Sequence, residues 1–240
     1  MIPRFFCPFP LNPGATVELP ADTAHHALNV LRVGAGDTAV LFDGRGGEWQ
    51  SALQPAGKRL LARLTSFSEA GPEASLRITL VQSLPAADKM DWIVQKAVEL
   101  GVFRIQPVAA RRSLVKLAGP RAERRLAHWQ AIAIAACEQS GRTHVPEVAP
   151  LLDLPQYLGS ATAGTRLICA PGAKAALRQL PAPVTPISLL IGPEGGFEDA
   201  ELRAAQAAGF QPVSLGPRVL RTETAGLAAL AAMMTLWGDI

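Results

Sequence analysis

The stretch ISLLIGPEGGFED, residues 187–199, decides the fold of this chain. Its first five residues form a continuous apolar run, and a strand of this kind is buried on both faces, as in a parallel sheet. Three glycines and a carboxylate follow directly, and residues 199–208 then have the composition of a helix. A buried strand that runs into a glycine-rich loop and a helix is the building unit of an α/β sheet.

The chain on either side of this stretch continues the alternation of strands and helices. We expect further strands at 76–84, 103–108, 166–170 and 213–215, and helices at 89–100, 121–140 and 222–236. Strands that alternate with helices predict a parallel sheet with helices packed on it. The expected fold class over residues 73–240 is therefore α/β.

Residues 1–70 have a different rhythm and form a second predicted domain. Short β-like runs at 38–43, 48–53 and 60–67 are separated by turn residues, including the glycine-rich loop GRGG at 44–47. One helix, expected at 25–33, interrupts them and is ended by Gly34. Short strands of this kind usually close into a small barrel. The polar, turn-rich stretch at 68–72 is the predicted linker.

Composition narrows the classes of function. The chain has 240 residues, of which 49% are hydrophobic, so it can bury a core and is not disordered. Its three cysteines include no C-x-x-C pair, and its four histidines lack metal-ligand spacing, so we expect neither a disulfide framework nor a metal site. No signal peptide begins the chain, and the longest apolar stretch, 225–237, is too short to span a bilayer. We expect a soluble, cytoplasmic protein.

A second glycine loop repeats the design of the first. VSLGPRVLRTETA, residues 213–225, is again a predicted strand, a glycine, a polar loop and the start of a helix. Ligands of open α/β sheets bind beyond the carboxyl ends of strands, where glycines let the backbone approach closely. Two such loops at one sheet edge predict the walls of a cofactor pocket. The alternative is an ordinary strand-to-helix turn in which Thr222 is only an N-cap.

Positive charge is local, because the formal net charge is only +3. A basic run begins in the loop after the strand expected at 103–108, and only Glu123 opposes it. That loop faces the same sheet edge as the glycine loops, which favours contacts with phosphates of a nucleic acid, although a solvated surface is the alternative. The run consists of Arg111, Arg112, Lys116, Arg121, Arg124 and Arg125.

These motifs closely resemble the signature of the RsmE family, the ribosomal small-subunit RNA (uracil-N3) methyltransferases of the SPOUT superfamily. The resemblance rests on IGPEGGF at 191–197 and LGPRVLRTETA at 215–225. It extends over essentially the whole chain, and one departure is Glu198-Asp199, where many relatives carry a serine or threonine helix cap that Asp199 can replace. The other matching segments are 4–6, 26–32, 95–102, 112–113 and 138–142.

The resemblance implies a PUA-like β-barrel over residues 1–70 that recognises RNA, and a SPOUT methyltransferase domain with a trefoil knot over 73–240. It also implies a homodimer that uses S-adenosylmethionine and no metal. The cofactor-binding residues that it implies are Ala170, Pro171, Ile191, Gly192, Pro193, Glu194, Gly195, Gly196, Leu215, Gly216, Leu220, Arg221, Thr222, Thr224 and Ala225.

The implied reaction is methylation of N3 of a specific uridine in 16S ribosomal RNA, on the assembled small subunit. The catalytic candidates are Arg221, Arg142, Glu194 and Glu223, and the choice of base between the two carboxylates stays open. Another RNA such as tRNA, a non-catalytic ribosome-assembly factor and a small-molecule methyltransferase are the alternatives. The RNA-binding candidates are Arg4, His25, Arg32, Arg111, Arg112, Ser113, Lys116, Gln139 and Arg142.

Overall fold

The computed structural model describes residues 2–69, 71–86, 88–160 and 163–240, and it divides the chain into two compact units. The first unit comprises residues 1–73 and 137–145, and the second comprises 74–136 and 146–240. The segment 137–145, which the sequence analysis placed in the second domain, thus groups with the first unit.

The first unit is a small β domain, as predicted. Its five-stranded sheet has the order β1-β3-β4-β5-β2, in which only the β1–β3 pair is parallel. All five strands and helix α1 contribute side chains to one core, around Phe5, Leu41 and Leu53. The strands are β1 (Arg4–Phe6), β2 (Thr16–Glu18), β3 (Thr38–Phe42), β4 (Glu48–Ala56) and β5 (Arg59–Ser68).

Helix α1 corrects the sequence prediction by about one turn. It spans Ala21–Asn29 rather than 25–33. Pro20, with φ −50°, occupies the N-cap, where its fixed φ suits a helix start. Arg32 has φ 56°, in the left-handed region, so the helix cannot extend through it. Leu31, two residues beyond the helix end, is 45% exposed.

The second unit contains the predicted parallel sheet. Its strands run in the order β12-β10-β11-β6-β7-β8, β9 pairs with β7, and every pair is parallel. Each residue of β11 is buried, as its apolar run predicts. The strands are β6 (Ile78–Ser83), β7 (Arg104–Ala109), β8 (Glu147–Val148), β9 (Leu152–Asp153), β10 (Thr165–Cys169), β11 (Ile187–Ile191) and β12 (Gln211–Val213).

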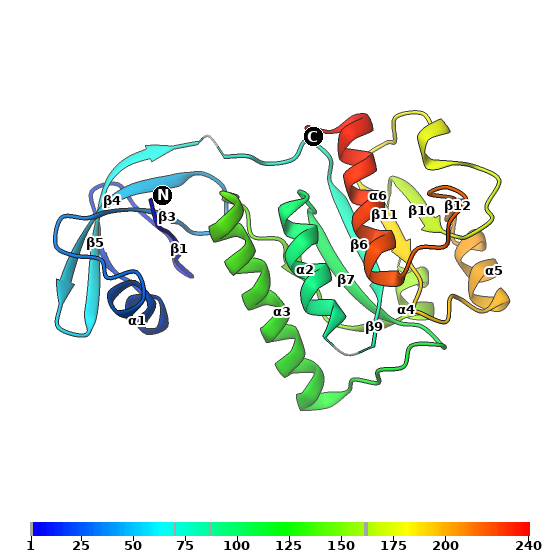
Figure 1. Cartoon of the computed structure of the whole chain (residues 1–240), viewed down its shortest axis with the longest axis horizontal. Coiled ribbons are helices and arrows are strands. Elements are labelled where there is room, and N and C mark those ends of the chain that lie inside the picture. The colour runs from blue at the N-terminus through cyan, green and yellow to red at the C-terminus, as the bar shows by residue number, and fades with distance from the viewer. Residues whose placement is uncertain (1, 70, 87, 161–162) are drawn as a thin grey trace. The chain divides into compact units, whose positions relative to one another are not determined.

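Helices pack on this sheet, and two of them flank the carboxyl ends of its central strands. Figure 1 shows α2 and α6 side by side, and α6 also contacts β6 and β11. No helix in the described part of the chain is long and apolar enough to cross a membrane. The trefoil knot stays a prediction. The helices are α2 (Lys89–Glu99), α3 (Gly119–Ser140), α4 (Leu154–Gly159), α5 (Asp199–Ala207), α6 (Thr222–Trp237) and the 3₁₀ turn η1 (Leu177–Gln179).

Candidate functional site

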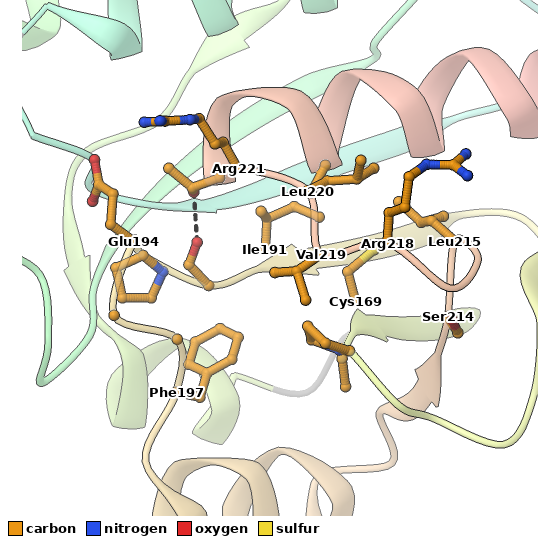
Figure 2. Close-up of a pocket in the computed structure, with 18 of the residues that line it drawn as sticks. Cys169, Ile191, Glu194, Phe197, Ser214, Leu215, Arg218, Val219, Leu220 and Arg221 are labelled. Atoms are coloured by element: carbon orange, nitrogen blue, oxygen red, sulfur yellow. Dashed lines mark hydrogen bonds between the residues drawn. The ribbon is translucent and has the colours of Figure 1, made fainter.

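A pocket of about 520 Å³ lies at the carboxyl ends of the neighbouring strands β12, β10 and β11 (Figure 2). Both glycine loops line it, as the sequence predicts. The cofactor-binding residues expected from the resemblance all line this pocket except Thr224, which is exposed on α6. The lining residues that the sequence analysis did not assign to the cofactor are Lys89, Cys169, Phe197, Leu202, Val213, Ser214, Arg218 and Val219.

Thr222 connects the two glycine loops to each other and to the sheet. Its buried hydroxyl donates to the carbonyl oxygen of Gly192 at 2.6 Å and accepts from Nε2 of Gln82 at 2.9 Å. Gln82 is fully buried in β6. The N-cap of α6 is Arg221 rather than Thr222, so the Thr222 hydroxyl serves the loops and not the helix end.

The glycines leave room at the pocket wall. Gly196 and Gly216 have φ of +66° and +128°, and a Cβ at either position would enter open space. At Gly192 a Cβ would lie 3.1 Å from the ring of Phe197, so a side chain there would require that ring to shift by a few tenths of an ångström. The backbone of both loops is therefore accessible to a ligand in the pocket.

The two carboxylates proposed as bases are ion-paired at the rim of the pocket. Oε1 of Glu194 accepts the N–H of Ala86 at 2.9 Å and lies 3.0 Å from Nζ of Lys89. Oε2 of Glu223 lies 3.3 Å from the same Nζ. Burial, the largest effect, raises the pKa of Glu194, but backbone hydrogen bonds and Lys89 together hold that pKa below its ordinary value. Glu194 is therefore a weak base at neutral pH.

Arg221 presents a cation at the same place. Its side chain is exposed and makes no hydrogen bond or ion pair with any residue that the structure describes. Figure 2 shows it extending from the start of α6 toward the side of the pocket where the Glu194 carboxylate lies. The guanidinium is thus available to a ligand.

The start of the basic run lies beside the first glycine loop. Nη1 of Arg112 donates to the carbonyl oxygen of Gly195 at 3.0 Å, and the N–H of Arg111 donates to Oε1 of Glu201 at 2.9 Å. Both arginine side chains remain largely exposed, as does Lys116. Ser113 shapes the same loop, because its Oγ accepts the N–H of Ala110. The structure therefore brings this part of the predicted RNA surface to the pocket.

Glu201 also corrects the expected cap of α5. Glu198, not Asp199, occupies the N-cap, and its N–H donates to Oε2 of Glu201 at 2.9 Å. The buried Glu201 carboxylate therefore holds both the helix start and the Arg111 loop.

Arg142 and Arg4 are engaged in internal ion pairs of the first unit, in contrast to their expected roles. Arg142 is only 5% exposed, and its Nη2 lies 2.9 Å from Oε2 of Glu73. Arg4 pairs with Glu48 at 2.6 Å and donates to the carbonyl oxygen of Gly141 at 2.9 Å. Burial and pairing give both guanidiniums a structural role in this unit, and their expected roles toward RNA stay predictions. Three other RNA-binding candidates of this unit, His25, Arg32 and Gln139, are exposed.

Two family models and several known proteins match this chain. The model of an RNA methyltransferase domain matches residues 72–234, and that of an RNA methyltransferase PUA domain matches 19–64. The chain is similar to Ribosomal RNA small subunit methyltransferase E of Synechocystis, with 37% identity over 92% of this chain and 74% of the relative. The protein of the same name from Bacillus subtilis is 33% identical over 91% of this chain and 89% of the relative.

Solved structures agree with the sequence relatives. Ribosomal RNA small subunit methyltransferase E from Neisseria gonorrhoeae, bound to S-adenosyl methionine, is 45% identical, and each chain covers 100% of the other with a TM-score of 0.94. A methyltransferase of Legionella pneumophila, in complex with the cofactor SAM, is 35% identical, again with full coverage of both chains and a TM-score of 0.95.

Proposed function

This chain belongs to the RNA methyltransferase family that includes the Ribosomal RNA small subunit methyltransferase E proteins, and we propose that it methylates N3 of a uridine in 16S ribosomal RNA. S-adenosylmethionine is the methyl donor. The single observation that carries the proposal is the pocket formed by the two glycine loops of the second unit, within a fold shared over its full length with a cofactor-bound relative.

The residues of the pocket fit this cofactor. The volume of about 520 Å³ lies within the usual range of small-molecule sites, and apolar side chains such as Ile191, Leu215 and Leu220 line it. The open space next to Gly196 and Gly216 lets the loop backbone approach a nucleoside closely. We propose that these loops hold the cofactor through backbone groups.

The proposed methyl transfer requires that uracil N3 and the methyl group be aligned and that negative charge on the uracil be stabilised; it does not require a metal. Bound S-adenosylmethionine supplies a methyl group that is already activated as part of a sulfonium. Uracil N3 becomes a nucleophile when it loses its proton, and negative charge then develops on the uracil ring. We propose that the exposed Arg221 guanidinium stabilises this charge, so that the N3 proton passes to a water molecule. Glu194 and Glu223, both paired with Lys89, are proposed to act as structural carboxylates rather than as the base.

RNA recognition is proposed to involve both units. Arg112 contacts Gly195 of the pocket, and Arg111 and Lys116 are exposed in the same segment, where we propose that they neutralise phosphates near the target base. In the first unit the exposed His25 and Arg32 are proposed to contact the RNA backbone, in agreement with the PUA domain match. Structured ribosomal RNA is recognised largely through shape, so a second contact surface raises specificity.

We propose that the protein works as a homodimer in the cytoplasm, where its RNA substrate resides. Helix α6 supports the first statement, because it carries no charged residue between Glu223 and its end at Trp237. Ala228, Ala231 and Leu236 on this helix are only partly covered. A helix that is apolar on all sides is normally buried, and a second copy of the chain would cover the remaining face.

Substitution of Gly216 tests the pocket. Gly216→Val places a side chain in the open space and forces valine into a left-handed backbone, so we expect binding of S-adenosylmethionine, measured by calorimetry, to be lost. Gly57→Val is the matched control, since Gly57 has φ +68° with open space around it but lies in the first unit. Equal affinity in a folded Gly216→Val variant would exclude the second glycine loop from the cofactor site.

A further inference from the structure

Lys89 stands where three segments of the second unit meet. It is the first residue of α2, while Glu194 belongs to the loop after β11 and Glu223 to the first turn of α6. Its Nζ lies 3.0 Å from Oε1 of Glu194 and 3.3 Å from Oε2 of Glu223. One ammonium group therefore joins the two cofactor loops, and it also lines the pocket between them.

The position of Lys89 at the start of α2 and the burial of the Glu223 carboxylate both indicate that these ion pairs serve the pocket. A cation in the first turn of a helix opposes the helix dipole, so Lys89 is unfavourable for α2 by itself. The Glu223 carboxylate is buried at Oε2, and Lys89 is the cation that lies within 4 Å of it among the described residues. Without Lys89 the carboxylates of two adjacent loops would face each other uncompensated, and like charges repel.

Lys89 and Glu194 are both charged at neutral pH. The hydrogen bond to Glu194 is the main cause that raises the pKa of Lys89 above its ordinary value of 10.5. The opposite pKa shift of Glu194, described above, keeps its carboxylate ionised. The bridge therefore persists under the conditions in which the site works.

We propose that Lys89 is a positioning residue, which holds the Gly192–Gly196 loop and the start of α6 in the arrangement that receives the cofactor. This inference rests on the proposed function. Lys89 acts through Glu194 and Glu223 and not on the uracil, because its charge is already neutralised by two carboxylates. Arg221 lines the same pocket and pairs with no carboxylate of the described residues, so its charge is available to the substrate.

Substitutions at Lys89 test this role, together with a matched control. Lys89→Met removes the charge and keeps the length of the side chain, Lys89→Arg keeps the charge, and Lys96→Met is the matched control. Lys96 lies on the same helix and pairs with Glu99 of α2 at 2.8 Å, outside the pocket. The measurements are the affinity for S-adenosylmethionine by calorimetry, kcat at saturating cofactor, and deuterium exchange of residues 192–198 and 214–225 in the cofactor-free protein.

We expect Lys89→Met to weaken cofactor binding by about three- to tenfold, the effect of two partly exposed ion pairs, and to speed exchange in both loops. At saturating cofactor its kcat should stay within about twofold of wild type, because only the loop arrangement is lost. Lys89→Arg should recover most of the affinity, and Lys96→Met should match wild type. Glu223→Gln should also weaken binding, and it should add little to Lys89→Met, since both remove one interaction.

Unchanged affinity and exchange in Lys89→Met would overturn the proposal. So would a fall in kcat at saturating cofactor with unchanged affinity, because Lys89 would then act on the substrate. If the wild-type chain bound no S-adenosylmethionine, the proposed function would fail, while exchange of the cofactor-free loops would still decide whether Lys89 joins them. If Lys89→Met does not fold, Lys89→Arg and Glu223→Gln carry the same comparison.

Discussion

At the scale of single residues, Thr222 shows how one hydroxyl group can fix a binding site. Its Oγ1 both donates to the loop carbonyl of Gly192 and accepts from the buried amide of Gln82. Gln82 is fully buried, so its amide cannot replace this partner with solvent, while the Gly192 carbonyl lies in a half-buried loop. The shape of the first glycine loop therefore depends on the side chain at position 222.

Thr222→Val should destabilise the protein by about 1–3 kcal/mol, because at nearly constant volume it removes one acceptor of the buried Gln82 amide and the donor to the half-buried Gly192 carbonyl. The same change should weaken binding of S-adenosylmethionine. Chemical denaturation and calorimetry measure the two effects. Thr222→Ser, which keeps the hydroxyl, is the control and should retain most of both properties. Wild-type stability in Thr222→Val would show that the hydrogen bonds contribute nothing.

The sequence could not predict contacts that join the site to residues far away along the chain. The glycine loops stand out because their composition is unusual for the ends of strands, and residues 191–197 and 215–225 indeed line the pocket for the most part. Lys89 and Gln82 lie more than 100 positions before their partners and belong to no motif around the loops. The one signal at Lys89 is its unfavourable position in the first turn of a helix. The sequence also gave no sign that Arg142 pairs with Glu73, because a charge cluster looks the same whether it faces solvent or a partly buried carboxylate.

At the scale of elements, the end of α3 and the residues after it form a structural segment rather than a catalytic one. Oε1 of Glu73 accepts the N–H groups of Thr143 and His144, both at 2.8 Å, while its Oε2 pairs with Arg142. Glu138, at the end of the same helix, accepts the N–H of Phe6 at 2.9 Å. The EQSGR cluster is thus explained by contacts within the first unit.

Glu73→Gln should lower the free energy of unfolding at pH 7 by about 2 kcal/mol, because a carboxylate accepts these hydrogen bonds more strongly than an amide. Burial is the largest effect and raises the pKa of Glu73, but the bonds from His144 and Thr143 and the charge of Arg142 bring it below the ordinary value of 4.5. Its stabilisation is therefore complete above pH 4.5 and is lost as the pH falls through the lower folded-state pKa.

The difference in unfolding free energy between wild type and Glu73→Gln should accordingly shrink in acid, which denaturant titrations from pH 7 to pH 3 can follow. Glu18→Gln, at an exposed pair with Arg59, is the control and should differ little from wild type at any pH. A constant difference for Glu73→Gln across this range would contradict the shifted pKa.

The ends of a strand or helix could be predicted where they coincide with the ends of a buried apolar run. β11 matches its expected bounds because an apolar run has one way to be buried on both faces. β12 ends at Val213 and not Leu215, since pairing with β10 stops there and the backbone of Ser214 bonds to Ala175 and Leu177 instead. α4 and the two-residue strands β8 and β9 carry too few residues for a period to appear.

At the scale of the whole molecule, the proposed cofactor pocket and part of the proposed RNA-binding surface belong to different units. Every residue that lines the pocket belongs to the second unit. The first unit takes residues 137–145 from the middle of the chain, so truncation near Glu73 would remove the partners of this segment. Point substitutions on the surface therefore test the division of roles more cleanly than a fragment does.

Arg111→Ala with Lys116→Ala should weaken binding of small-subunit RNA and reduce the slope of log affinity against log salt by about 0.7–0.9 for each lost phosphate contact. Cofactor affinity should stay close to wild type, because Arg112, which holds Gly195, is left in place. Arg178→Ala with Arg203→Ala removes the same charge from exposed positions outside the basic run and should leave the slope unchanged. An identical slope in both double variants would assign Arg111 and Lys116 to an ordinary solvated surface.

The most direct test of the central claim is mass-spectrometric mapping of modified nucleosides after reaction of the purified protein with unmodified small ribosomal subunits. With S-adenosylmethionine present, the account predicts N3-methyluridine at one position of 16S ribosomal RNA, absent with Gly216→Val and present with Gly57→Val. Methylation of tRNA alone, of a different atom, or of no RNA by a protein that binds the cofactor would contradict it.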